Sequence, residues 1–118
     1  MIPELLVFLT INLYRSSLGL PELDRNYSTC HLASIRLREI RRDGYLNHDG
    51  FYERIDRLRK SGEWYENLAK LYPNKDPIGL VVDWHRSPTH KTNLQAEATY
   101  GCVRSDGVYF VFIAKEPK

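Results

Sequence analysis

The stretch YGCVRSDGVYFVFIA, residues 100–114, decides the fold class of this 118-residue chain. Its two halves, residues 100–104 and 108–114, are rich in β-branched and aromatic side chains, and the sequence Ser-Asp-Gly separates them. Two such runs around a short connection that contains glycine predict an antiparallel hairpin. Helical patterns dominate the sequence before the hairpin, so we expect an α+β fold with helices first and strands last.

The first predicted helix covers residues 1–14, and Gly19 and Pro21 follow as stop signals. Pro3 suits the first turn of a helix, because its missing N–H would have no partner there. Apolar side chains then recur three to four residues apart, which predicts one face packed on the core. This face consists of Leu5, Leu6, Leu9 and Leu13.

The second predicted helix begins among residues 24–28, which offer several capping side chains, and ends at Gly44. Its apolar stripe consists of Cys30, Ala33, Leu37 and Ile40. The basic side chains of the helix lie mostly outside this stripe, and we expect them at the surface. They are Arg36, Arg38, Arg41 and Arg42.

Two shorter helices follow in the prediction. Residues 49–58 form one, with Phe51, Ile55 and Leu58 turned inward, and the Ser-Gly pair at 61–62 ends it. Residues 71–77 are dominated by Pro and Asn and predict a loop, after which residues 78–86 are apolar enough for a fourth helix. Pro88 ends that helix, since a residue before proline is disfavoured in the helical region.

Size and charge exclude several classes of protein. A chain of 13.8 kDa with 42% hydrophobic and 27% charged residues is ordinary for one globular domain, which we place at residues 1–118. A net charge of +2 is far from that of a dedicated nucleic-acid binder. The basic residues between 36 and 60 alternate with acidic ones at helical intervals, which favours a salt-bridged surface. The N-terminal stretch has no basic segment or cleavage site typical of a signal peptide, and no transmembrane segment is predicted.

The two cysteines, Cys30 and Cys102, allow one disulfide at most and lack the CxxC spacing of a zinc knuckle or redox site. Cys30 falls on the apolar stripe of the second helix, and Cys102 falls on a predicted strand. We therefore expect buried free thiols that pack as small hydrophobic side chains.

Three residues stand out as candidates for chemistry. His48 lies on a tight polar connection between two predicted helices, where functional side chains concentrate, although it could equally stabilise the turn. Glu66 has aromatic and apolar neighbours in the sequence WYENLA, a setting that raises a carboxyl pKa or demands a partner for the charge. The alternative is a surface carboxylate on a short strand. His90 follows the end of the fourth helix and could also serve as a cap or turn residue, whereas His31 fits a helix surface.

These residues belong to motifs that occur in a fixed order. They are Asn12-Leu-Tyr-Arg15 with residues 19–23 (GLPEL), residues 45–48 (YLNH), residues 66–69 (ENLA), residues 81–94 (VVDWHRSPTHKTNL) and residues 100–103 (YGCV). Together they resemble the CAP superfamily of cysteine-rich secretory, antigen-five and pathogenesis-related group-one proteins, also called SCP-like domains, in its compact bacterial or phage form. The resemblance extends from about residue 12 to residue 112.

The resemblance implies an α-β-α sandwich, with a small antiparallel sheet between helical layers and a cleft formed by His48, Glu66 and His90. Two positions depart from the family pattern: Tyr65 replaces the glycine before Glu66, and Ser87 stands where eukaryotic members have a second cleft glutamate. Two imidazoles and one carboxylate make a partial, open site for zinc or another divalent metal ion.

The function expected from the resemblance is a binding or interaction module, with His48, His90 and Glu66 as metal ligands. Its partner would be a small ligand, a lipid or another protein, and we expect a monomer with an extracellular or virion-associated role. The alternative is a hydrolase in which His48, Glu66 and His90 act as catalytic groups or activate a metal-bound water. The sequence contains neither a G-x-S-x-G nor an H-E-x-x-H motif.

Overall fold

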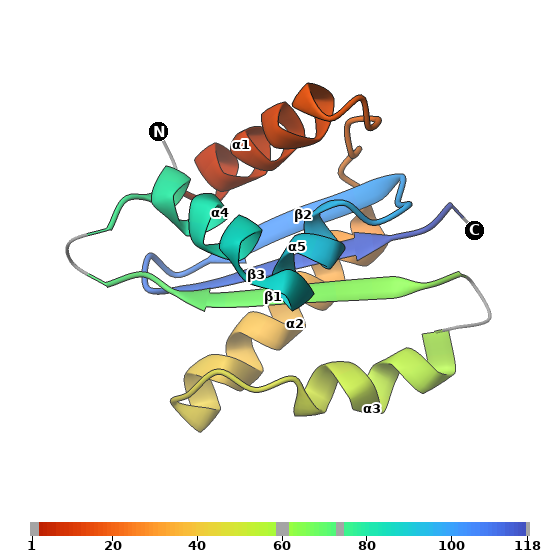
Figure 1. The fold of residues 1–118 in the computed structure, drawn as a ribbon. Helices are drawn as coiled ribbons and strands as arrows, with labels where there is room; N and C mark the ends of the chain where they lie inside the picture. Colours follow the sequence, from red (N-terminus) through yellow and green to blue (C-terminus); the bar gives the residue numbers. More distant parts are fainter. Residues whose placement is uncertain (1–2, 59–61, 73–74, 118) are drawn as a thin grey trace.

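Three antiparallel strands form the middle layer of the chain, in the order β1-β3-β2. The computed structural model describes residues 3–58, 62–72 and 75–117. Its elements follow one another as α1 (Pro3–Ser17), α2 (Tyr27–Asp43), α3 (Asp49–Leu58), β1 (Trp64–Lys70), α4 (Pro77–Arg86), α5 (Pro88–Leu94), β2 (Tyr100–Ser105) and β3 (Tyr109–Lys115). Helices α1 and α4 lie on one side of the sheet and α2 and α3 on the other, so the fold is an α-β-α sandwich (Figure 1).

The predicted hairpin is confirmed as β2 and β3. The predicted order of helices first and strands last is wrong, because β1 precedes α4 and α5 and pairs with β3 along its whole length. Trp64 of β1 pairs with Lys115 of β3, and Lys70 pairs with Tyr109. Because side chains alternate across a strand, the central strand β3 contributes side chains to the hydrophobic core on both sides of the sheet. Phe110 and Phe112 pack towards α1 and α4, whereas Val111 and Ile113 pack towards α2 and α3.

The predicted inner face of α1 is wrong. The side chains that face the sheet are Val7, Phe8, Ile11, Asn12 and Arg15. Leu5, Leu9 and Leu13 lie at the surface, and Leu13 is 70% exposed. The helix is apolar on more than one side, so spacing alone did not identify the buried face. The polar pair Asn12 and Arg15 decided the orientation, because both side chains bind backbone groups inside the fold.

Arg15 is a buried cation that binds carbonyl oxygens. Its Nε donates to the oxygen of Pro21 at 2.9 Å, and Nη1 donates to the oxygens of Leu94 and Ala96 at 3.0 and 2.9 Å. Burial lowers the pKa of Arg15. Asn12 holds Leu23 in the same way, with its amide donating to one backbone group and accepting from the other. The Asn-x-x-Arg motif therefore fixes the connection that follows α1 and the connection between α5 and β2.

Helix α2 begins and ends as predicted. The Asn26 side chain accepts from the Thr29 N–H at its start, and Gly44 closes its end in the left-handed conformation at φ 78°. The predicted surface position of Arg36 is wrong, because this side chain is completely buried. It lies three residues after Ala33 and therefore on the same helical face.

Helices α3 and α4 also match the prediction, with Phe51 and Ile55 buried and the Asp76 side chain capping α4. Ser61, at the predicted end of α3, lies outside the described residues. Helix α5 was not predicted. Pro88 ends α4 but also occupies the first turn of α5, where a proline is well tolerated.

The prediction of two free thiols is wrong as well, because Cys30 and Cys102 form a disulfide, with 5.1 Å between their Cα atoms. Helix α2 packs across β2 and β3, which brings the half-buried Cys30 against the buried Cys102. The bond ties the first turn of α2 to an edge strand. In the described part of the chain, no helix has the length and apolar character needed to cross a membrane.

Replacing both Cys30 and Cys102 by Ala should lower the free energy of unfolding by about 3 to 4 kcal/mol, since the bond closes a long loop in the unfolded chain. The sequence separation of the two cysteines is 72 residues. Urea unfolding with and without a reducing agent measures the effect. Two titratable thiols in the denatured, unreduced protein would contradict the bond.

Candidate functional site

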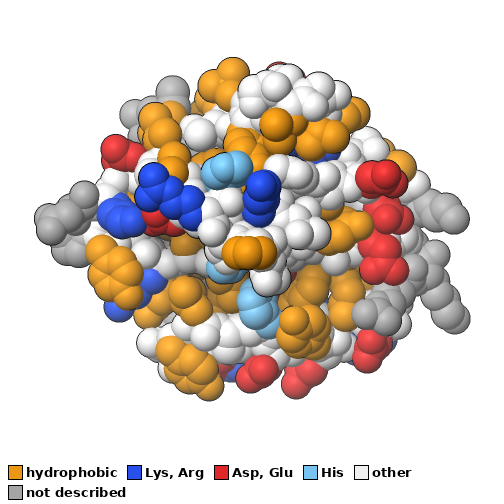
Figure 2. Space-filling model, viewed as in Figure 1, with side chains coloured by type: hydrophobic (Ala, Val, Ile, Leu, Met, Phe, Trp, Pro, Cys, Tyr) orange, Lys and Arg blue, Asp and Glu red, His pale blue; other side chains and the backbone are white. Residues whose placement is uncertain are grey.

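The three residues singled out in the sequence come from three different elements. His48 ends the connection between α2 and α3, Glu66 lies in β1, and His90 lies in α5. The structure joins the first two directly, with 2.7 Å between His48 Nδ1 and Glu66 Oε1. His90 is near enough that the charge of His48 affects its pKa. Histidine side chains reach the surface on the face that carries α4 and α5 (Figure 2).

Glu66 is a buried carboxylate, with 4% of its surface exposed. In the pleat of β1 its side chain shares a face with Trp64 and Leu68 and points towards α2. Oε1 contacts His48, and Oε2 accepts from Arg36 Nε at 2.8 Å. The alternative of a surface carboxylate is therefore wrong, and the requirement for a charge partner is confirmed.

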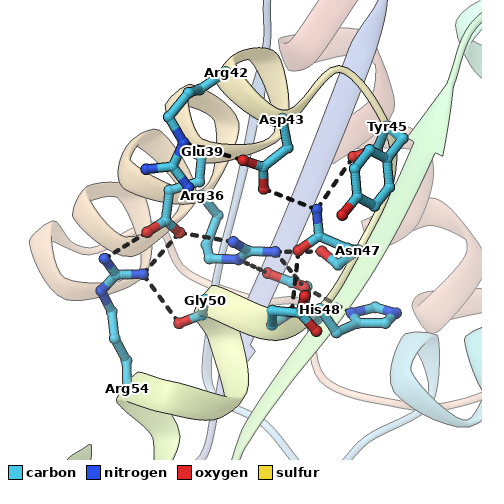
Figure 3. Close-up of polar contacts among 11 residues, drawn as sticks. Arg36, Glu39, Arg42, Asp43, Tyr45, Asn47, His48, Gly50 and Arg54 are labelled. Atoms are coloured by element: carbon cyan, nitrogen blue, oxygen red, sulfur yellow. Dashed lines mark hydrogen bonds and ion pairs between the residues drawn. The ribbon is translucent and has the colours of Figure 1, made fainter.

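Arg36 is the charge partner of Glu66, which the sequence analysis did not identify. Its guanidinium donates to Glu66, to Glu39 Oε1 at 2.7 Å, and to the backbone oxygen of Asn47 (Figure 3). Burial alone would lower the pKa of Arg36, but hydrogen bonds and charges from Glu66 and Glu39 outweigh it and raise the pKa. The available signal was its place on the apolar stripe of α2, between Ala33 and Ile40.

A second ion pair, between Arg54 and Glu39, holds the Glu39 carboxylate that Arg36 also binds. Glu39 accepts from both Nη1 and Nη2 of Arg54, at 2.8 and 2.7 Å. The hydrogen bond from Arg54, opposed by burial and supported by Arg36, lowers the pKa of Glu39 to about 2. Gly50 permits this packing, because a Cβ atom there would overlap the Glu39 carboxylate and the Arg36 guanidinium. Figure 3 shows α2 and α3 meeting at this cluster.

The connection that carries His48 is held by its own polar contacts. The Asn47 side chain donates to Asp43 Oδ2 at 3.0 Å and accepts from the Asp49 N–H at 3.2 Å. The His48 ring lies 5.9 Å from the Tyr52 ring, centre to centre, and its side chain is 38% exposed. The ring therefore has one nitrogen on Glu66 and its other edge towards solvent.

Among the described residues, the hydrogen bond that positions His90 involves its backbone in α5 and not its ring. Its backbone oxygen accepts from the Asn67 side chain at 3.0 Å. Asn93, one turn later, donates to Asn67 Oδ1 and to the backbone oxygen of Glu66, at 2.9 and 3.0 Å. These bonds fasten α5 to β1. Burial, and secondly the charge of His48, lower the pKa of His90.

The site thus contains the imidazoles of His48 and His90, and the Glu66 carboxylate contacts the ring of His48. Within residues 3–58, 62–72 and 75–117, no group of three or more His, Cys, Asp and Glu side chains is arranged to hold a metal ion. An open pocket of about 300 Å³ beside the site includes His90, Ser87 and Trp84. A larger cavity of about 800 Å³, lined by His31 and Trp64 among others, contains none of the three candidates.

No family model matches the sequence, and no curated protein matches it either. Solved structures do match, at 20 to 21% identity. One is an extracellular protein containing an SCP domain from Bacillus anthracis, with a TM-score of 0.82 over 97% of this chain and 40% of that one. A second is a cysteine-rich secretory protein from Staphylococcus aureus, with a TM-score of 0.82 over 97% of this chain and 38% of that one. A third is an outer surface protein from Borrelia burgdorferi, with a TM-score of 0.81 over 98% of this chain and 93% of that one.

The chain therefore has the SCP-like, or CAP, fold, as the motifs predicted. It spans about two fifths of the length of the Bacillus and Staphylococcus proteins. It spans nearly all of the Borrelia protein.

Replacing Glu39 by Gln should remove a part of the acid sensitivity of the fold. The pKa of Glu39 is about 2 in the folded chain, against 4.5 for a free side chain. Its ionisation therefore stabilises the fold above about pH 4.5, and this contribution is lost as the pH falls towards 2. Urea unfolding across this pH range measures the slope. The exposed Glu53, changed to Gln, is the control, and equal slopes for wild type and Glu39→Gln would contradict the assignment.

Proposed function

We propose that this chain is a binding module in which His48 and His90 hold a divalent metal ion of the zinc type, or a small ligand, at the open edge of the site. The observation that carries the proposal is the 2.7 Å contact between His48 Nδ1 and Glu66 Oε1. A histidine that ligates a metal ion characteristically gives its other ring N–H to a carboxylate, which orients the ring and raises its basicity.

The contact decides which nitrogen of His48 is free. Arg36 forms an ion pair with Glu66, so the carboxylate accepts and does not donate. The proton of a neutral His48 ring therefore lies on Nδ1, and the lone pair of Nε2 is free towards solvent. Glu66 supports the ligand without being required as one.

His90 supplies the second nitrogen. Its lowered pKa keeps the ring neutral at pH 7, and only a neutral imidazole can donate a lone pair to a metal ion. Two imidazoles leave two of the four positions of a zinc ion to water or to a ligand. An ion held in this way is bound weakly and can accept a group from a second molecule, which suits a binding function.

The structural relatives support a role outside the cell. One is described as an extracellular protein, one as a cysteine-rich secretory protein and one as an outer surface protein. The Cys30–Cys102 disulfide agrees with this placement, because such bonds persist in oxidising compartments.

The second candidate function is hydrolysis, which the same contact favours. A histidine backed by a carboxylate can act as a general base through its free nitrogen. In the described residues, no hydroxyl or thiol is hydrogen-bonded to His48, so its Nε2 would have to activate a water molecule rather than a side-chain nucleophile. The binding function requires no such partner and is preferred.

The metal site is tested by calorimetric titration of zinc chloride into wild type, His48→Ala and His90→Ala. Each variant should lose about tenfold or more in affinity, because each removes one of two ligands. Zinc affinity of the wild type should also fall below about pH 6, where imidazoles bind protons. His31→Ala, at an exposed histidine stacked on Tyr27, is the matched control. Equal affinity of His90→Ala and wild type would overturn the site.

The hydrolase is tested by incubating the protein with peptide, ester, phosphodiester and cell-wall substrates, with and without zinc and a chelator. We expect no turnover above that of the His48→Ala variant. Turnover that disappears in both His48→Ala and Glu66→Gln would replace binding by catalysis as the function.

A further inference from the structure

The geometry assigns a further role to Arg36: it positions the site, because it holds the Glu66 carboxylate against His48 and keeps that carboxylate from turning outwards to a bound metal ion. The part that concerns metal binding rests on the function proposed above. The part that concerns the His48 ring holds for the chain without any metal. Arg36 is fully buried, and its hydrogen bonds within the described residues go to Glu66, Glu39 and Asn47 rather than to the His48 ring, so its action is indirect.

The contact between Arg36 and Glu66 has the shape of a fork. Nε donates to Oε2 at 2.8 Å and Nη2 donates to Oε1 at 3.4 Å, so the planar guanidinium faces both carboxylate oxygens. Such a fork fixes the plane of the carboxylate, which a lysine ammonium would not. With Oε2 held by Arg36, Oε1 is directed at Nδ1 of His48.

The same guanidinium also holds the backbone next to His48. Nη2 of Arg36 also donates to the carbonyl oxygen of Asn47, the residue directly before His48. One side chain of α2 therefore fixes both partners of the contact, the acid on β1 and the backbone that carries the histidine. Figure 3 shows Arg36 between Glu39, Asn47 and His48.

Arg36 is itself held in place by neighbouring side chains. Its Nη1 donates to Glu39, and Glu39 is held by two bonds from Arg54 of α3. Gly50 closes the space beside this pair, where even one further carbon would overlap it. A side chain that is fully buried and bonded through all three nitrogens keeps one conformation.

The contacts of Glu66 determine which atoms a metal ion would meet at the site. Both oxygens of Glu66 are engaged by Arg36 and His48, so among the three candidate residues a metal ion meets imidazole nitrogen and not the carboxylate. Nitrogen ligands suit zinc, copper and nickel, whereas magnesium and calcium prefer oxygen. Arg36 therefore keeps the Glu66 carboxylate out of the set of ligands and fixes its orientation.

The test is the position of the ring proton of His48, read from long-range ¹⁵N–¹H correlation spectra of the metal-free protein with the ring neutral. In wild type we expect the proton on Nδ1 only. In Arg36→Lys, which keeps the positive charge but loses the fork, we expect a mixture of the two tautomers. Zinc affinity should fall about tenfold in the same variant. Leu32→Ala, a core variant one turn earlier in α2, should be destabilised but keep the wild-type tautomer.

Each result decides one part of the proposal. A wild-type His48 with its proton on Nε2 overturns the role of Arg36 without any variant, even if Arg36→Lys does not fold. An Arg36→Lys protein with unchanged tautomer and unchanged zinc affinity overturns it as well. A wild type that binds no zinc overturns the metal function alone, and the tautomer of His48 in Arg36→Lys then still decides whether Arg36 positions the ring.

Discussion

The buried guanidinium of Arg36 is the constraint on which the arrangement of α2, α3 and β1 depends. A charge without contact to water is tolerated only when opposite charges and hydrogen-bond acceptors surround it. Glu66 and Glu39 supply the charge, and Asn47 supplies a carbonyl oxygen. These acceptors come from a strand, from the same helix and from a connection, so all three must stay in register for the cation to remain paired.

Arg15, on the other side of the sheet, is also a buried cation, but backbone oxygens stabilise it instead of carboxylates. Its described partners are carbonyl oxygens, and accordingly its pKa is lowered whereas that of Arg36 is raised. Carbonyl dipoles stabilise the cation less than carboxylates do, but any connection that passes near the cation can provide a backbone carbonyl oxygen. One of them belongs to Leu94, the last residue of α5. Arg15 thus anchors the helix that carries His90, while Arg36 anchors the connection that carries His48.

The sequence predicted those elements whose signals are local. The Ser-Asp-Gly turn, Gly44 after α2 and the helix of residues 49–58 were all recognised from their own residues. The inner face of α1 was not, because leucines occur on its outer side as well, and the decision depended on what Arg15 binds far along the chain. The disulfide likewise depends on α2 packing across β2, which no local pattern contains.

For the site, the sequence predicted the three residues but not the contact between them. Glu66 was singled out for its apolar neighbours, and its burial follows from them. Its charge partner could not be found in this way, because Arg36 is 30 residues away in the sequence and was assigned to the surface with the other arginines of its helix. Arginines on one helix differ in role according to the face they occupy, and Arg36 shared the face of Ala33.

The position of β1 at the edge of the sheet explains why such a site can exist in so small a fold. A side chain on a strand faces one layer only, and Glu66 faces the layer of α2 and α3. A histidine from the opposite layer can approach it only around a free edge. Helix α5 does this by binding the backbone of Glu66 and the side chain of Asn67 through Asn93. The bonds that cover the edge of β1 are therefore the same bonds that hold α5, and with it His90, at the strand that carries Glu66.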